Sequence, residues 1–274
     1  MAKIATLGPP NTFSDIATQQ FIKTQNLNHE IKYFKSLSDT FRAIGVHCEF
    51  GVLPIENLSE GYVQVVLDHL LETSLNIIAE YLLPIQFSFV RYSESDGPLT
   101  DVFVQFVAYG QCSEFIEQQN NIRVHYTQSN ISSLVEAQKK GKGAGAVVPK
   151  HALKSECLMS SVVENITNYE NNQTRFLVVS TEPCIYQPAV NYKTTLVVKN
   201  DNDCPGVLGN IINAFAAQKV NLTSIMSRPT KSQFGQYHFF IDIDGHQQDE
   251  NIKLAILNIK NDHVIRVLGS YPKA

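Results

Sequence analysis

The sequence predicts an α/β protein of two domains, and three observations lead to this prediction. From residue 2 to about residue 180, short runs rich in β-branched and aromatic residues alternate with stretches whose apolar residues recur at helical spacing. Residues 181–190 contain two prolines and no such period, which is typical of a linker. Beyond the linker the elements follow the order βαββαβ, the split βαβ plan of a ferredoxin-like domain. We therefore predict a first domain built on largely parallel sheets and a second domain of the ferredoxin-like type.

The first domain begins with a strand, and its helices are recognised by their spacing and ends. Phe13, Ala17 and Phe21 fall on one face of a helix, and Gly141 marks the end of another. The predicted strands are Lys3–Leu7, Ile31–Phe34, Phe50–Ile55, Asn76–Ile85, Phe87–Arg91, Val102–Phe106, Arg123–Tyr126 and Gly143–Pro149. The predicted helices are Thr12–Lys23, Leu37–Cys48, Gly61–Thr73 and Ser129–Lys140.

The second domain starts after the linker and contains a helix whose start is indicated by Pro205 and Gly206. The predicted strands are Thr194–Val198, Asn221–Ser227, Gln236–Asp244 and His263–Leu268, and the predicted helices are Val207–Gln218 and Glu250–Leu257. Ferredoxin-like modules expose a sheet edge and helix faces that commonly pair with a second copy. A homodimer or homotetramer is therefore expected.

Composition excludes several classes of function. The chain has 274 residues, of which 43% are hydrophobic and 18% charged, enough for the cores of about two domains. A net charge of -4 and the lack of a basic cluster argue against a nucleic-acid partner. No apolar run is long enough to span a bilayer, and the start of the chain reads as a strand, so no membrane partner or signal segment is expected. The five cysteines are scattered without CxxC spacing, which favours a reducing cytoplasm and predicts no metal site.

A hydroxyl, a guanidinium and an aromatic ring are adjacent at the entrance to the strand Leu177–Ser180. Thr174 can donate a hydrogen bond, Arg175 can bind a carboxylate through two parallel bonds, and Phe176 can exclude water. These three residue types together predict a site for a small anion. On spacing alone, a β-branched residue and a solvated charge in a strand remain the alternative.

Polar turns at the ends of two predicted strands offer further candidates. Thr12 lies at a strand-to-helix turn, where it is either an N-cap or a ligand of an anion bound at the helix start. Glu56 and Asn57 end another strand, and ligands bind at the carboxyl ends of parallel strands. The alternatives are a solvated loop carboxylate for Glu56 and a local Asx turn for Asn57.

Five motifs follow one another along nearly the whole chain. Gly8–Ser14 resembles GPxGTFS, Pro54–Gly61 resembles PIENSxEG, Asn172–Phe176 matches NxTRF, Pro205–Leu208 resembles PGAL, and Asn221–Pro229 resembles NLTxIESRP. Together they resemble the motifs of a bacterial prephenate dehydratase with a C-terminal ACT regulatory domain. Each motif alone is a weak signal, whereas their joint order is specific.

The resemblance implies a two-lobed catalytic domain, similar to type II periplasmic binding proteins, followed by an ACT domain. The expected catalytic domain is 1–182, with lobe one at about 1–76 plus 160–182 and lobe two at about 77–159, and the expected ACT domain is 191–274. The implied reaction removes the ring carboxylate of prephenate as carbon dioxide and the ring hydroxyl as water, giving phenylpyruvate for phenylalanine biosynthesis. No cofactor is implied.

The resemblance also assigns roles to residues. Thr174 is the expected catalytic group, which polarises the leaving hydroxyl. The expected substrate-binding residues are Thr12, Glu56, Asn57, Ser59, Asn172, Arg175 and Phe176. The implied effector is L-phenylalanine, and its expected contacts are Gly206, Val207, Leu208, Asn221, Leu222, Met226, Ser227, Arg228 and Pro229.

Several positions depart from the family pattern. Asn11 stands where a Gly is usual, and Leu58 stands at the Ser of PIENS. In the middle lobe, Val104–Cys112 keeps little of the pattern SHPQALxQC, and Ser129–Ser133 keeps little of STAxA. Met226 replaces the Glu of ESRP, so weaker control by phenylalanine is expected.

These departures leave alternative functions open. The altered middle lobe is compatible with arogenate dehydratase or with a non-aromatising prephenate decarboxylase. A catalytically idle amino-acid sensor that keeps the two-lobed clamp is a further alternative. The intact sequence Thr174-Arg175-Phe176 favours an enzyme over the sensor.

Overall fold

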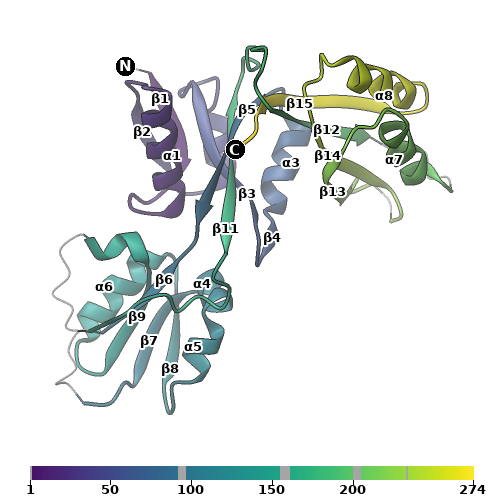
Figure 1. The fold of residues 1–274 in the computed structure, drawn as a ribbon. Helices are drawn as coiled ribbons and strands as arrows, with labels where there is room; N and C mark the ends of the chain where they lie inside the picture. The colour runs from purple at the N-terminus through teal and green to yellow at the C-terminus, as the bar shows by residue number, and fades with distance from the viewer. Residues whose placement is uncertain (1, 92–96, 155–160, 200–204, 233) are drawn as a thin grey trace.

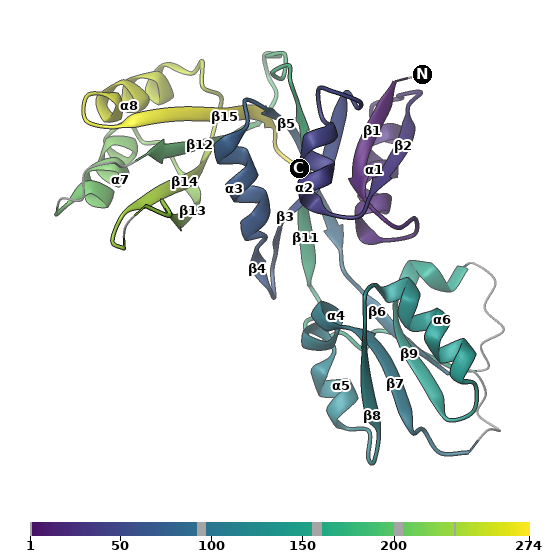
Figure 2. The ribbon, with the colours of Figure 1, turned by 180° about the vertical axis from the view of Figure 1, so that it is seen from behind.

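The computed structural model describes residues 2–91, 97–154, 161–199, 205–232 and 234–274, and three β-sheets organise these residues. Figure 1 shows the first sheet at the upper centre, the second sheet below it and the third sheet to its right. The view from behind in Figure 2 shows the same separation, with the C-terminus close to the centre of the molecule. Among the described helices, none is both long enough and apolar enough to cross a membrane.

The first sheet has the strand order β2–β1–β3–β11–β5, and β4 pairs with β3. Its strands are β1 (Lys3–Leu7), β2 (Glu30–Phe34), β3 (Phe50–Asn57), β4 (Gly61–Tyr62), β5 (Asn76–Pro84) and β11 (Gln173–Ser180). β1 runs parallel to β2 and β3, whereas β11 runs antiparallel to β3 and β5. The start of β11 therefore lies beside the end of β3, although more than a hundred residues separate them in sequence.

The helices that cover the first sheet differ from the predicted ranges at their ends. They are α1 (Phe13–Thr24), α2 (Leu37–Ala43) and α3 (Gln64–Glu72). The side chain of Thr12 accepts a hydrogen bond from the backbone N–H of Asp15 and so caps α1. α2 ends before the predicted Cys48, and Gly45 just beyond it has a φ of 78°, outside the helical range. α3 begins later than predicted because Tyr62 belongs to β4, which pairs with β3.

The second sheet has the strand order β10–β6–β9–β7–β8 and forms a separate lobe. Its strands are β6 (Phe87–Arg91), β7 (Asp101–Gln105), β8 (Arg123–Thr127), β9 (Ala144–Pro149) and β10 (Ser161–Val163). Around it lie α4 (Phe106–Gln111), α5 (Ser113–Glu117), α6 (Asn130–Lys140) and the 3-10 helix η2 (Lys150–Lys154). The sequence pattern does not predict α4 and α5, because helices of 6 and 5 residues show too little of a helical period.

The boundaries between the two lobes differ from the predicted ones. β5 lies in the first sheet, so lobe one extends past residue 76 to Pro84. β10 pairs with β6, so Ser161–Val163 belongs to lobe two. Where the chain crosses between the lobes, the backbone N–H of Ile85 donates to the carbonyl oxygen of Asn172 at 2.8 Å. Apolar strands of either lobe look alike in sequence, which explains the misplaced boundaries.

The third sheet follows the linker and has the strand order β13–β14–β12–β15. Its strands are β12 (Tyr192–Lys199), β13 (Leu222–Pro229), β14 (Tyr237–Asp244) and β15 (Val264–Pro272), and its helices are α7 (Val207–Ala217) and α8 (Glu250–Lys260). One face of the sheet packs on both helices, through Leu196, Ile241 and Ile211 among others. The order of these elements is the predicted βαββαβ.

The other face of the third sheet packs against the first lobe. A shared apolar cluster contains Val197 and Leu268 from the third sheet and Ile55 and Ile77 from the first. β15 lies so close to β5 that a Cβ atom on Gly269 would be 2.1 Å from the carbonyl oxygen of Ile77. A backbone oxygen cannot move aside as a side chain can, so this contact requires glycine.

Candidate active site

A cleft of about 400 Å³ lies between the first and second lobes. β1 and β3 both end at it, as expected for a ligand site at the carboxyl ends of parallel strands. Of the residues predicted to act on a substrate, Thr12, Asn57, Thr174 and Phe176 line this cleft. The structure thus brings together the predicted strand-to-helix turn, the end of β3 and the start of β11.

Thr174 and Asn57 face each other across β11 and β3. The Nδ2 group of Asn57 donates to Thr174 Oγ1 at 2.8 Å and to the carbonyl oxygen of Gln173 at 3.2 Å. Its Oδ1 accepts from the backbone N–H and the hydroxyl of Ser59 at 2.9 and 2.7 Å, and from the backbone N–H of Glu60 at 3.1 Å. These donors fix the amide so that it presents N–H to Thr174. The hydroxyl hydrogen of Thr174 therefore stays available for another acceptor.

β3 is irregular beside Thr174. Along β11, residues 174 and 176 pair with residues 57 and 54 of β3, so β3 has one residue more than β11 over this stretch. Pro54 lies at this irregular position, where the absence of an N–H group is tolerated. On β11, Thr174 and Phe176 both face the cleft, as alternate residues of a strand do.

The first turns of α1 and α6 meet the cleft from opposite lobes. Thr12 and Phe13 at the start of α1 line the cleft, as do Ser129 and Asn130 at the start of α6. The first N–H groups of a helix have no partner within the helix and carry partial positive charge. The two helix ends can therefore bind two anionic groups, one on each wall of the cleft.

The turn that precedes α1 depends on Asn11. Asn11 has a φ of 65°, a left-handed conformation that Gly and Asn adopt more readily than other residues. Its backbone N–H donates to Asp15 Oδ2 at 2.7 Å, and the hydroxyl of Tyr33 donates to Asp15 Oδ1 at 2.7 Å. The Asn in place of the usual Gly is thus compatible with the same turn.

The described residues that line the cleft include no Lys, Arg or His side chain, whereas Glu60 contributes a carboxyl group. Phe13, Phe87, Val107 and Phe176 provide apolar walls. Within the described part of the chain, no three His, Cys, Asp or Glu side chains gather as a metal site requires. An anionic ligand in this cleft depends on helix N-termini and on neutral hydrogen-bond donors.

Arg175 lies outside the cleft, which corrects its predicted role as a carboxylate clamp. Its side chain leaves β11 on the face opposite Thr174 and Phe176. Arg175 Nη1 is 2.6 Å from Asp242 Oδ2 in β14, and Nη2 is 3.2 Å from Glu56 Oε2. Burial alone would lower the pKa of Arg175, but the carboxylate of Asp242 outweighs this effect and raises it. Glu56, predicted to bind substrate, likewise forms an ion pair behind the cleft.

Ser59 and Asn172 support the cleft without lining it. Ser59 donates to Asn57, as described above. Asn172 is 2% exposed, and its Nδ2 group donates to Oε1 of Gln111, a residue of α4 that does line the cleft. This bond joins the residue just before β11 to lobe two.

Sequence reasoning did not single out Tyr62 and Phe87 as site residues, although both line the cleft. Tyr62 falls in the predicted helix Gly61–Thr73 and Phe87 in the predicted strand Phe87–Arg91, and neither residue has a local pattern that marks a site. Burial raises the pKa of the Tyr62 hydroxyl, which hydrogen-bonds to Ser224 of β13.

The predicted effector residues fall on two different surfaces. Gly206, with a φ of 92°, and Leu208 are exposed at the start of α7. Met226 and Arg228 instead point from β13 toward the first lobe. Met226 packs against the shared apolar cluster, and Arg228 Nη2 is 2.7 Å from Asp68 Oδ1 in α3.

The remaining predicted effector residues also differ in their surroundings. Val207 is buried and Leu222 packs on the core between the third sheet and its helices. Asn221 donates to Asp244 Oδ2 at 2.8 Å. Ser227 and Pro229 are exposed.

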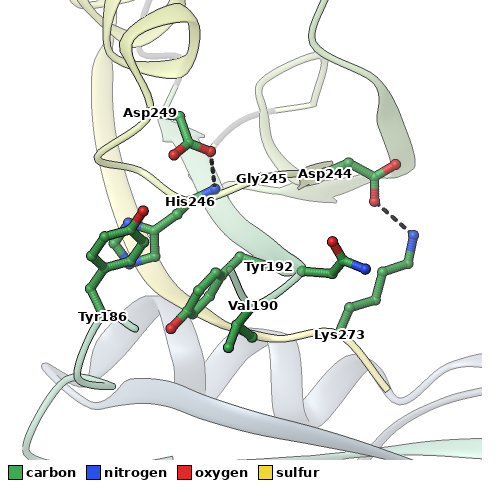
Figure 3. Close-up of a pocket in the computed structure, with 9 residues that line it drawn as sticks. Tyr186, Val190, Tyr192, Asp244, Gly245, His246, Asp249 and Lys273 are labelled. Atoms are coloured by element: carbon green, nitrogen blue, oxygen red, sulfur yellow. Dashed lines mark hydrogen bonds and ion pairs between the residues drawn. The ribbon is translucent and has the colours of Figure 1, made fainter. Parts of the chain in front are cut away.

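A second pocket, of about 370 Å³, lies where the linker meets the third sheet (Figure 3). The rings of His246 and Tyr186 are in contact at a tilt of 41°, with centroids 4.4 Å apart, and burial lowers the pKa of His246. Lys273 Nζ is 2.8 Å from Asp244 Oδ1, and the backbone N–H of His246 donates to Asp249 at 2.8 Å. These polar groups pair with one another, and none of the predicted site residues lines this pocket. The cleft between the lobes is therefore the stronger candidate for an active site.

Comparison with known proteins agrees with this arrangement. The Prephenate dehydratase family profile matches residues 4–184, and the ACT domain profile matches residues 194–261. A prephenate dehydratase of Methanocaldococcus jannaschii is 31% identical over 273 residues, covering 99% of this chain and 98% of that protein. The solved prephenate dehydratase of Arthrobacter aurescens, in complex with L-Phe, is 27% identical, with a TM-score of 0.87 over 100% of this chain and 90% of the other. The Staphylococcus aureus enzyme structure is 28% identical, with a TM-score of 0.81 over 99% of this chain and 100% of the other. The chain therefore belongs to the prephenate dehydratase family and carries a C-terminal ACT domain.

Proposed function

We propose that the cleft converts prephenate to phenylpyruvate, with Thr174 as the group that assists departure of the ring hydroxyl. Family membership supports the reaction. The observation that carries the role of Thr174 is its 2.8 Å hydrogen bond from Asn57, an amide whose orientation is fixed by donors on its other side. The enzyme is a carbon–oxygen lyase.

In the proposed reaction, the bond between the ring and its carboxylate breaks, and the electron pair enters the ring as carbon dioxide leaves. The bond between the ring and the hydroxyl oxygen breaks at the other end of the ring, and that oxygen leaves as water after taking up a proton. Negative charge grows on this oxygen in the transition state, where a hydrogen bond from Thr174 is strongest. A threonine hydroxyl is a weak acid. Thr174 therefore acts as a hydrogen-bond donor that polarises the leaving oxygen, and it is not the sole source of the proton.

The proposed binding mode uses the two helix N-termini for the two carboxylates of prephenate. The start of α1 with Thr12 and the start of α6 with Asn130 lie on opposite walls. Phe176 and the other apolar residues enclose the ring. Arg175 takes no part in binding, since carboxylates of the protein already surround its guanidinium.

Arogenate is the second candidate substrate, and the charges of the cleft favour it. Arogenate carries an ammonium group where prephenate has a keto oxygen. Glu60 lines the cleft while the described lining residues include no basic side chain. A carboxylate attracts an ammonium group and repels a dianion, so this cleft suits a ligand with less net negative charge than prephenate.

L-phenylalanine is the proposed effector, and a pair of ACT domains is its proposed site. The related structure from Arthrobacter aurescens contains L-Phe. β13 is an edge strand of the third sheet, and Ile225 on it and Ile212 on α7 are 43% and 38% exposed. These apolar side chains suit burial against a second copy, which supports a homodimer or homotetramer.

Cys48, Cys112 and Cys184 are free thiols, consistent with a cytoplasmic location.

The function is tested by incubating purified protein at neutral pH with prephenate or with arogenate. Phenylpyruvate is measured by its absorbance in alkali, and phenylalanine by chromatography. Formation of phenylpyruvate that is lost in Thr174→Ala supports the prephenate assignment. A larger kcat/KM for arogenate assigns the second candidate, and consumption of neither substrate contradicts both.

A further inference from the structure

Arg175 connects the back of the active-site strand to the ACT domain. Arg175 is 9% exposed and Asp242 is 5% exposed. Besides the 2.6 Å contact with Asp242, Arg175 Nη1 is 3.4 Å from Glu80 Oε2. Asp242 is on β14, in the other domain, and it makes the shortest ion pair of the guanidinium. A buried, charged hydrogen bond of this length holds its two ends firmly.

The position of Asp242 is itself set by the ACT domain. The hydroxyl of Thr195 donates to Asp242 Oδ1 at 2.6 Å and hydrogen-bonds to the hydroxyl of Tyr271 at 2.7 Å. Lys193 Nζ is 2.7 Å from both carboxylate oxygens of Glu80, which neutralises the second acid near Arg175. Asp242 is therefore the carboxylate that the ACT domain holds against Arg175, beside Glu56 of β3.

The same two strands carry the polar pair of the cleft and the ionic pair behind it. Thr174 pairs with Asn57 on the cleft side, and the adjacent pair, Arg175 with Glu56, faces the ACT domain. The register of β3 and β11 shifts between Arg175 and Phe176, next to the Arg175–Glu56 pair and one pair away from Thr174 and Asn57, and such an irregularity constrains the backbone less than a regular ladder. Because Thr174 and Arg175 are consecutive residues of β11, the ion pair that holds Arg175 also restricts the backbone that carries Thr174 Oγ1.

We propose that Asp242 of the ACT domain is a positioning residue for the dehydratase reaction, because its bond to Arg175 holds Thr174 in register with Asn57. The proposal rests on the proposed role of Thr174. It makes the ACT domain a part of the catalytic apparatus even without an effector.

The test compares two variants that each remove one carboxylate from the domain interface, in the full-length protein and without phenylalanine. Asp242→Asn keeps the shape of the side chain and removes its charge. Asp68→Asn is the matched control, because Asp68 lies on α3 and pairs with Arg228 and Lys231 across the same domain interface. Asp242→Asn is expected to lower kcat by about tenfold to a hundredfold, as for small misplacements of a catalytic group, with KM within about twofold. Asp68→Asn is expected to lower Tm and to leave kcat within about twofold.

A double variant shows whether Asp242 acts through Thr174. If it does, adding Asp242→Asn to Thr174→Val lowers kcat by less than about twofold further. Hydrogen exchange gives a readout that needs no turnover. The amides of 173–176 are expected to exchange faster in Asp242→Asn than in Asp68→Asn.

The inference is wrong if Asp242→Asn has the wild-type kcat and wild-type amide exchange at residues 173–176. It is also wrong if Asp68→Asn lowers kcat as much as Asp242→Asn does, or if the effects of Asp242→Asn and Thr174→Val on kcat multiply in the double variant. Thr195→Val serves if Asp242→Asn does not fold. It removes the hydrogen bond that orients Asp242 while keeping the charge, and it is expected to lower kcat several-fold with the same exchange signature. Unchanged kcat and exchange in this variant equally refute the inference. Failure of the wild-type protein to turn over prephenate would contradict the proposed function, whereas the exchange result still decides the link between Asp242 and β11.

Discussion

Replacing Thr174 by Val gives the sharpest test of the proposed chemistry, because valine has nearly the shape of threonine without the hydroxyl. The variant removes the donor to the leaving oxygen and leaves the apolar contacts of β11 in place. Loss of one preorganised donor in a transition state typically lowers kcat by about 10² to 10³, or about 3–4 kcal/mol. KM is expected to change by less than about threefold, since the bond strengthens chiefly in the transition state.

The cost to folding is small by comparison. Asn57 Nδ2 loses its 2.8 Å bond to Thr174 but keeps the carbonyl oxygen of Gln173 at 3.2 Å. The amide is not left without an acceptor, so the free energy of unfolding falls by about 1 kcal/mol. For a chain of this size, Tm then falls by about 2–4 °C. A large loss of kcat with a small loss of Tm separates chemistry from stability.

The assay follows phenylpyruvate by alkaline absorbance over a range of prephenate concentrations, with thermal unfolding measured on the same samples. Thr174→Ser is the matched control, because it restores the hydroxyl, and it is expected to keep kcat within about tenfold of wild type. A Val variant with kcat within threefold of wild type, or a loss confined to KM, refutes the reasoning about the leaving hydroxyl.

Three further predictions concern stability and are checked by thermal unfolding. Burial alone would raise the pKa of Asp101, but the hydrogen bond from His125 and nearby cationic side chains hold it at about 2, below the ordinary value of 3.8. The ionised Asp101 stabilises the fold above about pH 4, and this stabilisation is lost as the pH falls toward 2. Asp101→Asn is therefore expected to lower Tm at pH 7 and to make Tm fall less steeply in acid. An unchanged dependence of Tm on acid pH contradicts this prediction. Asn11→Val places a β-branched residue at a φ of 65° and is expected to cost about 1–2 kcal/mol, whereas Asn11→Gly costs little; equal Tm values for the two variants would disprove the strain. Gly269→Ala directs a Cβ atom at a carbonyl oxygen of β5 and is expected to cost about 3 kcal/mol or more, while Gly209→Ala, in an open part of α7, is neutral or stabilising; a Gly269→Ala protein as stable as wild type would contradict the close approach.

Adjacent residues in the sequence led to one prediction that the structure corrects. Thr174, Arg175 and Phe176 are consecutive, and their chemical types suggested one site. A strand sends alternate side chains to opposite faces, so the hydroxyl and the ring reach the cleft while the guanidinium reaches another domain. Asp242, which makes the shortest ion pair with Arg175, lies 67 residues further along the chain, and no local motif marks it.

The sequence pattern predicted the alternation of strands and helices well, because apolar spacing reports local burial. It could not predict the partner of each strand. The contact between Asn57 and Thr174 joins residues 117 positions apart, and only the return of β11 into the first sheet creates it. The misplaced lobe boundaries have the same origin, since β5 and β10 show no feature that specifies their sheets.

The close packing of β15 on β5 bears on how such enzymes exchange regulatory modules during evolution. The ACT domain profile ends at residue 261, before β15 begins at Val264. Yet β15 supplies Leu268 and the glycine that touches Ile77, and so covers apolar surface of the catalytic part. A recombination event that transplanted only the profile-matched segment would leave that surface open to water and to other chains. An exchange that keeps this surface covered therefore has to include β15 together with the rest of the ACT domain.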